Sequence, residues 1–63
     1  MLLTEKEKEV LSDLVAGVSY KMIASKQAIS YHTVNFHIRN IYKKMHVNSV
    51  GEAVAKALKE KMI

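Results

Sequence analysis

The sequence lacks cysteine and proline altogether and has only two glycines, Gly17 and Gly51. Without cysteine there can be no disulfide and no cysteine-based zinc site, and this composition suits the reducing cytoplasm, where we expect the protein to work. The scarcity of helix-breaking residues favours an all-α fold. The chain has no apolar run of about 18 residues and no charged-then-apolar leader, so neither a membrane span nor a signal peptide is predicted.

Acidic side chains are absent from the middle of the chain, between Asp13 and Glu52. The same window contains five cationic side chains, and the whole chain has a formal net charge of +4. These cations are Lys21, Lys26, Arg39, Lys43 and Lys44. Such segregation is typical of a surface that binds a polyanion. Charge alone leaves open a second interpretation, which is a solvated basic surface without a partner.

The length of 63 residues predicts one small domain, residues 1–63, with a single modest core. Hydrophobic periodicity predicts four helices, at about residues 5–16, 20–27, 30–45 and 50–61. Thr4 with Glu7, and Ser49 with Glu52, have the spacing of capping boxes. Gly17 suits the left-handed residue that follows the C-terminus of the first helix.

The segment 30–45 has two chemically different faces. Val34, Ile38, Ile41 and Met45 recur at steps of four, three and four, which predicts a buried stripe. The opposite face is polar and cationic, and residues 30–45 contain no carboxylate. Its residues are His32, Asn35, Phe36, Arg39 and Lys43. A tight turn of three residues separates this segment from the helix 20–27, so the pair is typical of a helix-turn-helix, and we interpret 30–45 as a DNA recognition helix.

The other apolar positions complete the predicted core. Met22, Ile23 and Ala24 are expected to form the buried side of the helix 20–27. The helix 50–61 has an apolar side of its own, part of which should cover the core and part of which can meet a second copy of the chain. That side consists of Val50, Ala53, Val54, Ala57 and Leu58.

The chain resembles the LuxR/FixJ (NarL)-type helix-turn-helix domain of bacterial transcription regulators, including response regulators. The resemblance covers Leu3 to about Leu58. It rests on LTEKEKEVL at 3–11, Gly17-Val18-Ser19, Lys21-Met22-Ile23-Ala24, Ile29-Ser30, Thr33-Val34, His37, Ile41, Lys44-Met45 and Ser49. The chain departs from the usual pattern at three positions, with Gln27 in place of leucine, Ala28 in place of glycine and Val50 in place of arginine.

The resemblance implies a four-helix domain whose third helix lies in the DNA major groove and whose fourth helix forms a two-fold dimer contact. The expected dimer interface is Val50, Ala53, Val54 and Ala57. In relatives a signal-sensing domain precedes this one, and the sequence is compatible with either an excised domain or a stand-alone protein. In the family, the positions that correspond to Asn35, Phe36 and Arg39 commonly reach base edges.

The chemistry of these three side chains suits base reading. The Arg39 guanidinium can donate two hydrogen bonds to guanine, Asn35 can pair with adenine, and Phe36 can contact a thymine methyl group. Each has an alternative: a phosphate contact or a solvated charge for Arg39, a phosphate or water-bridged contact for Asn35, and packing against the helix 20–27 for Phe36.

A second set of residues is expected to contact phosphates, because they lie in the first turn of the recognition helix or carry positive charge. The set is Lys21, Ser30, Tyr31, His32, Thr33, Lys43 and Lys44. Ser30 and Thr33 can instead act only as helix caps, and Lys44 can be a solvated charge.

The sequence predicts neither a metal site, nor a cofactor, nor catalysis. His32, His37 and His46 are five and nine residues apart, which does not place two ligands on one helix face. No nucleophile elbow, glycine-rich phosphate loop or converging carboxylate pair is present. Two other functions remain open: a protein-interaction module that binds a partner such as RNA polymerase, and a basic helix on an anionic membrane. We expect no membrane binding, because the core uses the apolar stripe.

Overall fold

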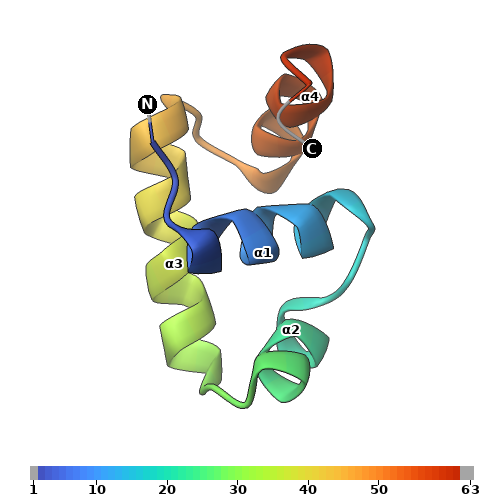
Figure 1. The fold of residues 1–63 in the computed structure, drawn as a ribbon, viewed down its shortest axis with the longest axis vertical. Helices are drawn as coiled ribbons and strands as arrows, with labels where there is room; N and C mark the ends of the chain where they lie inside the picture. Colours follow the sequence, from blue (N-terminus) through green and yellow to red (C-terminus); the bar gives the residue numbers. More distant parts are fainter. Residues whose placement is uncertain (1, 62–63) are drawn as a thin grey trace.

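The computed structural model describes residues 2–61, and this part of the chain contains four α-helices and no strand (Figure 1). The helices are α1 (Glu5–Val15), α2 (Tyr20–Gln27), α3 (Tyr31–Met45) and α4 (Val50–Lys59). The predicted all-α class and the four helices are confirmed, with bounds that differ from the predicted ones by no more than two residues. α3 is the longest helix and packs against each of the other three, while α1 also packs against α4.

The helix N-termini are closed by the side chains that the sequence indicates. The Thr4 hydroxyl accepts a hydrogen bond from Glu7 N at 3.1 Å, and the Glu7 carboxylate accepts one from Thr4 N at 2.9 Å, which confirms the capping box. At α4 the box is only half formed. Ser49 Oγ accepts from Glu52 N, but the Glu52 carboxylate accepts from Asn48 N at 3.3 Å and not from Ser49 N.

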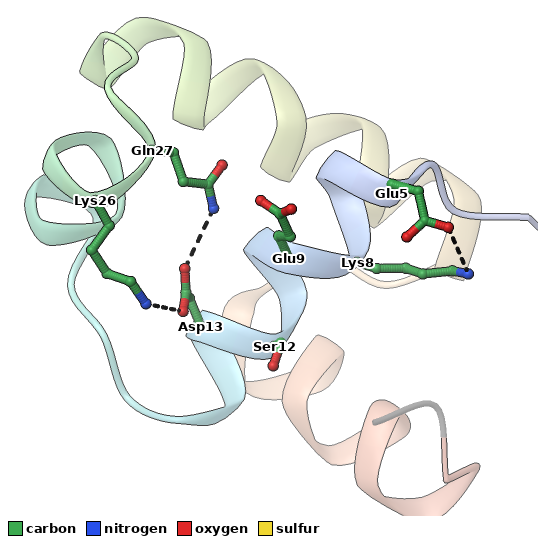
Figure 2. Close-up of a pocket in the computed structure, with 7 residues that line it drawn as sticks. All are labelled: Glu5, Lys8, Glu9, Ser12, Asp13, Lys26 and Gln27. Atoms are coloured by element: carbon green, nitrogen blue, oxygen red, sulfur yellow. Dashed lines mark hydrogen bonds and ion pairs between the residues drawn. The ribbon is translucent and has the colours of Figure 1, made fainter.

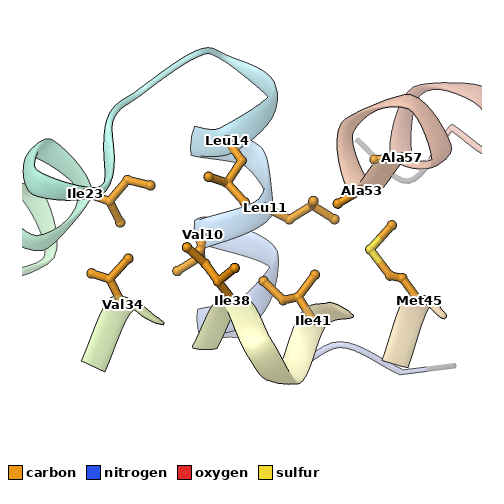
Figure 3. Packing of buried hydrophobic residues seen from close by; sticks show 10 residues of the cluster. All are labelled: Val10, Leu11, Leu14, Ile23, Val34, Ile38, Ile41, Met45, Ala53 and Ala57. Carbon is orange, nitrogen blue, oxygen red and sulfur yellow. The ribbon is translucent and has the colours of Figure 1, made fainter. Parts of the chain in front are cut away.

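Among residues 2–61, ten buried hydrophobic residues form the core, and every helix contributes to it (Figure 3). They are Val10, Leu11, Leu14, Ile23, Val34, Ile38, Ile41, Met45, Ala53 and Ala57. The predicted stripe of α3 is confirmed, because none of its four side chains is more than 2% exposed. The prediction for α2 is wrong in one residue: Met22 is 55% exposed, and Ile23 is the fully buried residue of that helix. Because α2 has only eight residues, few of its side chains can face the core.

The C-termini of α1, α2 and α3 end in the same way, with a left-handed residue and a pair of backbone hydrogen bonds typical of a Schellman motif. The left-handed residues are Gly17, with φ of 81°, Ala28, with φ of 54°, and His46, with φ of 58°. Gly17 confirms the prediction made for it. Ala28 stands in the turn of the helix-turn-helix, where glycine would avoid the clash between Cβ and the backbone.

Replacing Ala28 by glycine should therefore raise the free energy of unfolding by about 0.5–1 kcal/mol, because the relief of left-handed strain exceeds the entropy cost of glycine. Urea unfolding followed by circular dichroism measures this change. Ala16→Gly is the matched control, since Ala16 has a right-handed backbone with φ of −76° and should lose stability on the same substitution. Equal effects at the two positions would contradict the strain argument.

Candidate nucleic-acid interface

The outer face of α3 is exposed along the length of the helix. His32, Phe36, Arg39 and Lys43 are all exposed, at steps of four, three and four, opposite the buried stripe. The Phe36 ring is 55% exposed and meets the ring of its neighbour His37 at a centroid distance of 5.8 Å. More than half of the Phe36 side chain is therefore open to a partner. An exposed aromatic ring with the cationic Arg39 next to it on the same face is available to a partner.

Asn35 lies at the edge of this face and is half-buried. Its side-chain amide donates a hydrogen bond to the Tyr31 carbonyl at 3.3 Å, one turn earlier in the same helix. This bond orients the amide group. It uses the side-chain nitrogen, so the side-chain oxygen takes no part in it. Asn35 can therefore present an acceptor at the edge of the exposed face.

The first turn of α3 combines capping with exposure. Ser30 Oγ accepts a hydrogen bond from Thr33 N at 3.0 Å, and the two hydroxyl oxygens are 2.9 Å apart. Tyr31 is 56% exposed, and its ring lies against that of Tyr20, with centroids 6.1 Å apart. Capping by Ser30 is confirmed, and it does not prevent this turn from meeting an anion, because the hydroxyls and the exposed His32 stand at the positive end of the helix.

The basic side chains of the middle of the chain fall into two groups. Lys44 Nζ lies 2.7 Å from a Glu7 oxygen, and Lys26 Nζ lies 2.7 Å from an Asp13 oxygen. Among residues 2–61, no carboxylate lies within ion-pairing distance of Lys21, Arg39 or Lys43. The cations on the outer face of α3 therefore keep their full charge for a partner, whereas Lys44 is engaged on the α1 side.

Lys26, one of the lysines that pair with a carboxylate, lines a groove between α1 and α2 (Figure 2). Asp13 reaches across it to Lys26, and the Gln27 amide donates to the other Asp13 oxygen at 3.4 Å. On α1 itself Lys8 faces Glu5 at 3.7 Å. Two ion pairs form between the charges that line this groove, and the third carboxylate, Glu9, pairs with Lys6 at 3.6 Å, so the groove offers a ligand little that is not already used.

The pair of Glu7 and Lys44 joins α1 to α3 and is set in a largely buried site, with the Glu7 side chain only 5% exposed. Burial raises the pKa of the Glu7 carboxyl, but hydrogen bonds from Lys44 and Thr4 and the Lys44 charge outweigh it, so the pKa is lowered from its ordinary value of 4.5. A lowered pKa in the folded state means that this carboxylate stabilises the fold above pH 4.5 and loses that effect as the pH falls through the lowered pKa.

Glu7→Gln should therefore cost about 1 kcal/mol of unfolding free energy at pH 7, since glutamine keeps the cap but not the ion pair, and Lys44 is partly exposed. The difference from the unaltered protein should shrink as the pH falls below 4.5. Urea unfolding at a series of pH values measures it. Glu5→Gln, in the same turn but 90% exposed, should change stability by less than about 0.5 kcal/mol at every pH. A pH-independent loss in Glu7→Gln would argue against the ion pair.

α4 requires a correction to the predicted dimer interface. Ala53 and Ala57 are 0% exposed, because they lie in the core of the domain, and their side chains have no surface to offer a second copy. Val50 and Val54 are half-buried and pack against the same core. An apolar stripe does remain on the outside of the helix. It consists of Gly51, Val54, Ala55 and Leu58, and Leu58 is 57% exposed.

His46 has no role in the predictions made from the sequence, yet it stands exposed at the end of α3, beside Arg39 and Lys43. The spacing of three residues from Lys43 is the sequence feature that could have indicated this position of His46. The left-handed backbone itself has no strong local signal at a histidine. Within residues 2–61, no three histidine or acidic side chains are placed to hold a metal ion. In the same part of the chain, no helix is long and apolar enough to cross a membrane.

A helix-turn-helix of α2 and α3, presenting a cationic outer face on its second helix, defines the class of small helical DNA-binding domains. Comparison with known proteins agrees. The family model described as "Bacterial regulatory proteins, luxR family" matches residues 1–57. The chain therefore belongs to the luxR family, a family of regulators and not of enzymes, and it corresponds to the DNA-binding output domain of response-regulator transcription factors.

Individual relatives are similar over most of the chain. The nitrate/nitrite response regulator NarP of Escherichia coli K12 is 50% identical over 48 residues, which are 76% of this chain and 22% of NarP. The transcriptional regulatory protein FixJ of Bradyrhizobium diazoefficiens is 36% identical over 61 residues, which are 97% of this chain and 30% of FixJ. The crystal structure of the response regulator ChrA, of a heme-sensing two-component system, matches the whole chain with a TM-score of 0.93 and 33% identity. The chain covers 31% of ChrA, so it spans less than a third of each of these proteins.

Proposed function

We propose that this chain binds double-stranded DNA in a sequence-specific manner, with the outer face of α3 in the major groove, as part of a transcription regulator in the bacterial cytoplasm. The observation that carries the proposal is the state of that face: its cations, Arg39 and Lys43, have no carboxylate partner within residues 2–61, and Phe36 is exposed next to Arg39. An α-helix fits the major groove, where each base pair presents a distinct pattern of donors and acceptors.

The side chains divide between base reading and phosphate binding. Arg39, Asn35 and Phe36 are proposed to reach base edges, because they occupy the middle of the exposed face or its edge. The phosphate contacts are assigned to the first turn of α3 and to cations without an ion-pair partner. They are Lys21, Ser30, Tyr31, His32, Thr33 and Lys43. Lys44 is better suited to holding α3 on α1, since its charge is engaged by Glu7 at 2.7 Å.

Dimer formation is the second part of the proposal. The outer stripe of α4, Gly51, Val54, Ala55 and Leu58, has small residues for close approach and one large exposed side chain. A two-fold contact through this stripe would set two copies of α3 on inverted half-sites about one helical turn apart. Two half-sites would compensate for the weak, salt-dependent binding expected of one small domain.

Selection of bound duplexes from a random double-stranded pool, at low salt, tests the proposal. Enrichment of an inverted repeat would support both sequence reading and a two-fold dimer. Enrichment of a single half-site would support the reading and argue against the dimer. Binding without enrichment would contradict base reading. No binding, even by two copies joined by a covalent linker, would contradict DNA binding and favour a protein partner such as RNA polymerase.

A further inference from the structure

The outer face of α3 combines side chains that form hydrogen bonds with one that cannot. His32, Arg39 and Lys43 have nitrogen atoms that can donate hydrogen bonds to DNA, whereas the fourth outer side chain is an aromatic hydrocarbon. This is Phe36, which is 55% exposed and lies between His32 and Arg39 on the helix surface. When the face enters the major groove, the ring loses contact with water and gains no hydrogen bond. It therefore needs an apolar group on the DNA.

The Phe36 ring is restrained by its neighbour in the protein. His37 is half-buried, and the centroids of the two rings are 5.8 Å apart with an angle of 62° between their planes. This edge-to-face arrangement is one that aromatic rings prefer. A ring restrained in this way loses less freedom when it meets a base edge, so more of the contact energy remains to discriminate between bases.

The 5-methyl group of thymine is the apolar group that standard bases present in the major groove. The modified base 5-methylcytosine carries the same group at the same ring position. The two pyrimidines differ at C4, where thymine has an accepting oxygen and 5-methylcytosine a donating amino group, and a phenylalanine ring bonds to neither. A carboxylate is the side-chain group that accepts from the cytosine amino group, and residues 30–45 contain none. Phe36 is therefore suited to recognise the methyl group and not the pyrimidine that carries it.

Arg39 determines which base lies beside that pyrimidine. It follows Phe36 by three residues, which is about 4.5 Å along the helix axis, and successive base pairs are about 3.4 Å apart. The two side chains therefore meet adjacent base pairs when α3 lies along the groove. The exposed guanidinium has no carboxylate partner within residues 2–61, so its donors are available to guanine.

We propose that Phe36 and Arg39 together read a 5-methylpyrimidine in the base pair next to a guanine, and that the domain accepts 5-methylcytosine at this position in place of thymine. The inference rests on the proposed function, since it names the chemical group that one base-reading residue recognises. Unmodified cytosine has no methyl group for the ring to contact and is bound more weakly. Methylation of a cytosine at this position therefore creates a stronger site, so the domain responds to the modification state of its DNA.

The test uses the duplex enriched by selection, in which the guanine is located as the base whose preference Arg39→Ala relaxes. The pyrimidine of the adjacent base pair in one half-site is synthesised as thymine or deoxyuridine opposite adenine, and as 5-methylcytosine or cytosine opposite guanine. Within each pair of duplexes the difference is one methyl group. Fluorescence anisotropy should show that the methylated duplex of each pair binds about three- to fourfold more tightly, the effect of burying one methyl group. For Phe36→Ala both ratios should fall to about one, because the methyl group has lost its contact.

Lys43→Ala is the matched control, because it removes a charge from the same face. It should weaken binding to all of these duplexes and keep both ratios. Each ratio compares two duplexes with the same protein, so a change in the stability of a variant cancels. Circular dichroism establishes that Phe36→Ala is folded.

Equal affinity of the unaltered chain for the two duplexes of each pair would overturn the inference and leave the proposed function intact. An enriched sequence without thymine in either base pair next to the guanine would do the same. Unchanged ratios in Phe36→Ala would show that another side chain meets the methyl group, and a methyl effect for thymine alone would contradict the response to methylation. If selection enriched no sequence, base reading and with it the proposed function would be contradicted.

Discussion

Replacing Arg39 by alanine is expected to weaken binding to the selected duplex by about 1–3 kcal/mol and to relax the preference at one base pair. The guanidinium is exposed, it has no carboxylate partner within residues 2–61, and its planar group can donate two hydrogen bonds to guanine. Fluorescence anisotropy with the selected duplex and with its single-base variants measures both effects. Circular dichroism should be unchanged, because Arg39 lies outside the core.

Lys43→Ala is the matched control, one turn further along the same face. This variant should weaken binding to all sequences alike and reduce the slope of log affinity against log salt by about one, as expected for the loss of a single phosphate contact. The two variants therefore separate base reading from phosphate binding on one helix. If both lost affinity equally on every sequence, the proposed division between Arg39 and Lys43 would be wrong.

A negative charge on the outer stripe of α4 should weaken binding to a DNA with two half-sites more than binding to a DNA with one. Leu58→Glu is expected to reduce the affinity for an inverted repeat by about 10²–10⁴-fold, the gain that linking two binding sites can provide, and to leave the affinity for a single half-site unchanged. The side chain is 57% exposed, so the fold should tolerate the substitution. Sedimentation of the protein with each duplex, together with anisotropy, measures stoichiometry and affinity.

Lys59→Gln provides the control for this variant, because it changes the net charge by the same amount on the next residue of α4. It should bind both duplexes nearly as the unaltered chain does. Binding of the inverted repeat by Leu58→Glu with undiminished affinity and two copies per duplex would show that α4 is not the dimer contact.

Much of the fold could be predicted from the sequence because it depends on local relations. The stripe of Val34, Ile38, Ile41 and Met45 follows from helical periodicity, and the cap of α1 follows from two side chains three residues apart. Sequence patterns could not place Met22, because an eight-residue helix has too few turns to define its inner side.

Contacts between residues that are far apart in the sequence could not be predicted, because they depend on how the helices pack and not on local sequence patterns. The pairing of Lys44 with Glu7 spans 37 positions and depends on the way in which α1 crosses α3. Ala53 and Ala57 form the apolar side of α4, but only the packed structure determines that α1 and α3 occupy that side. In the candidate site, the exposed face of α3 was predictable from periodicity, whereas the position of the exposed His46 depends on a left-handed turn that no glycine or asparagine at that residue indicates.

The central position of α3 has a consequence for how such a domain can change during evolution. This helix packs against all three others, so its amide hydrogens should be among the last to exchange with solvent. Its inner face fixes the fold, and its outer side chains at 32, 36, 39 and 43 have almost no part in that packing. Substitutions on the two faces should therefore affect stability and recognition nearly independently. A lineage can acquire a new target sequence through the outer face without first evolving a more stable domain.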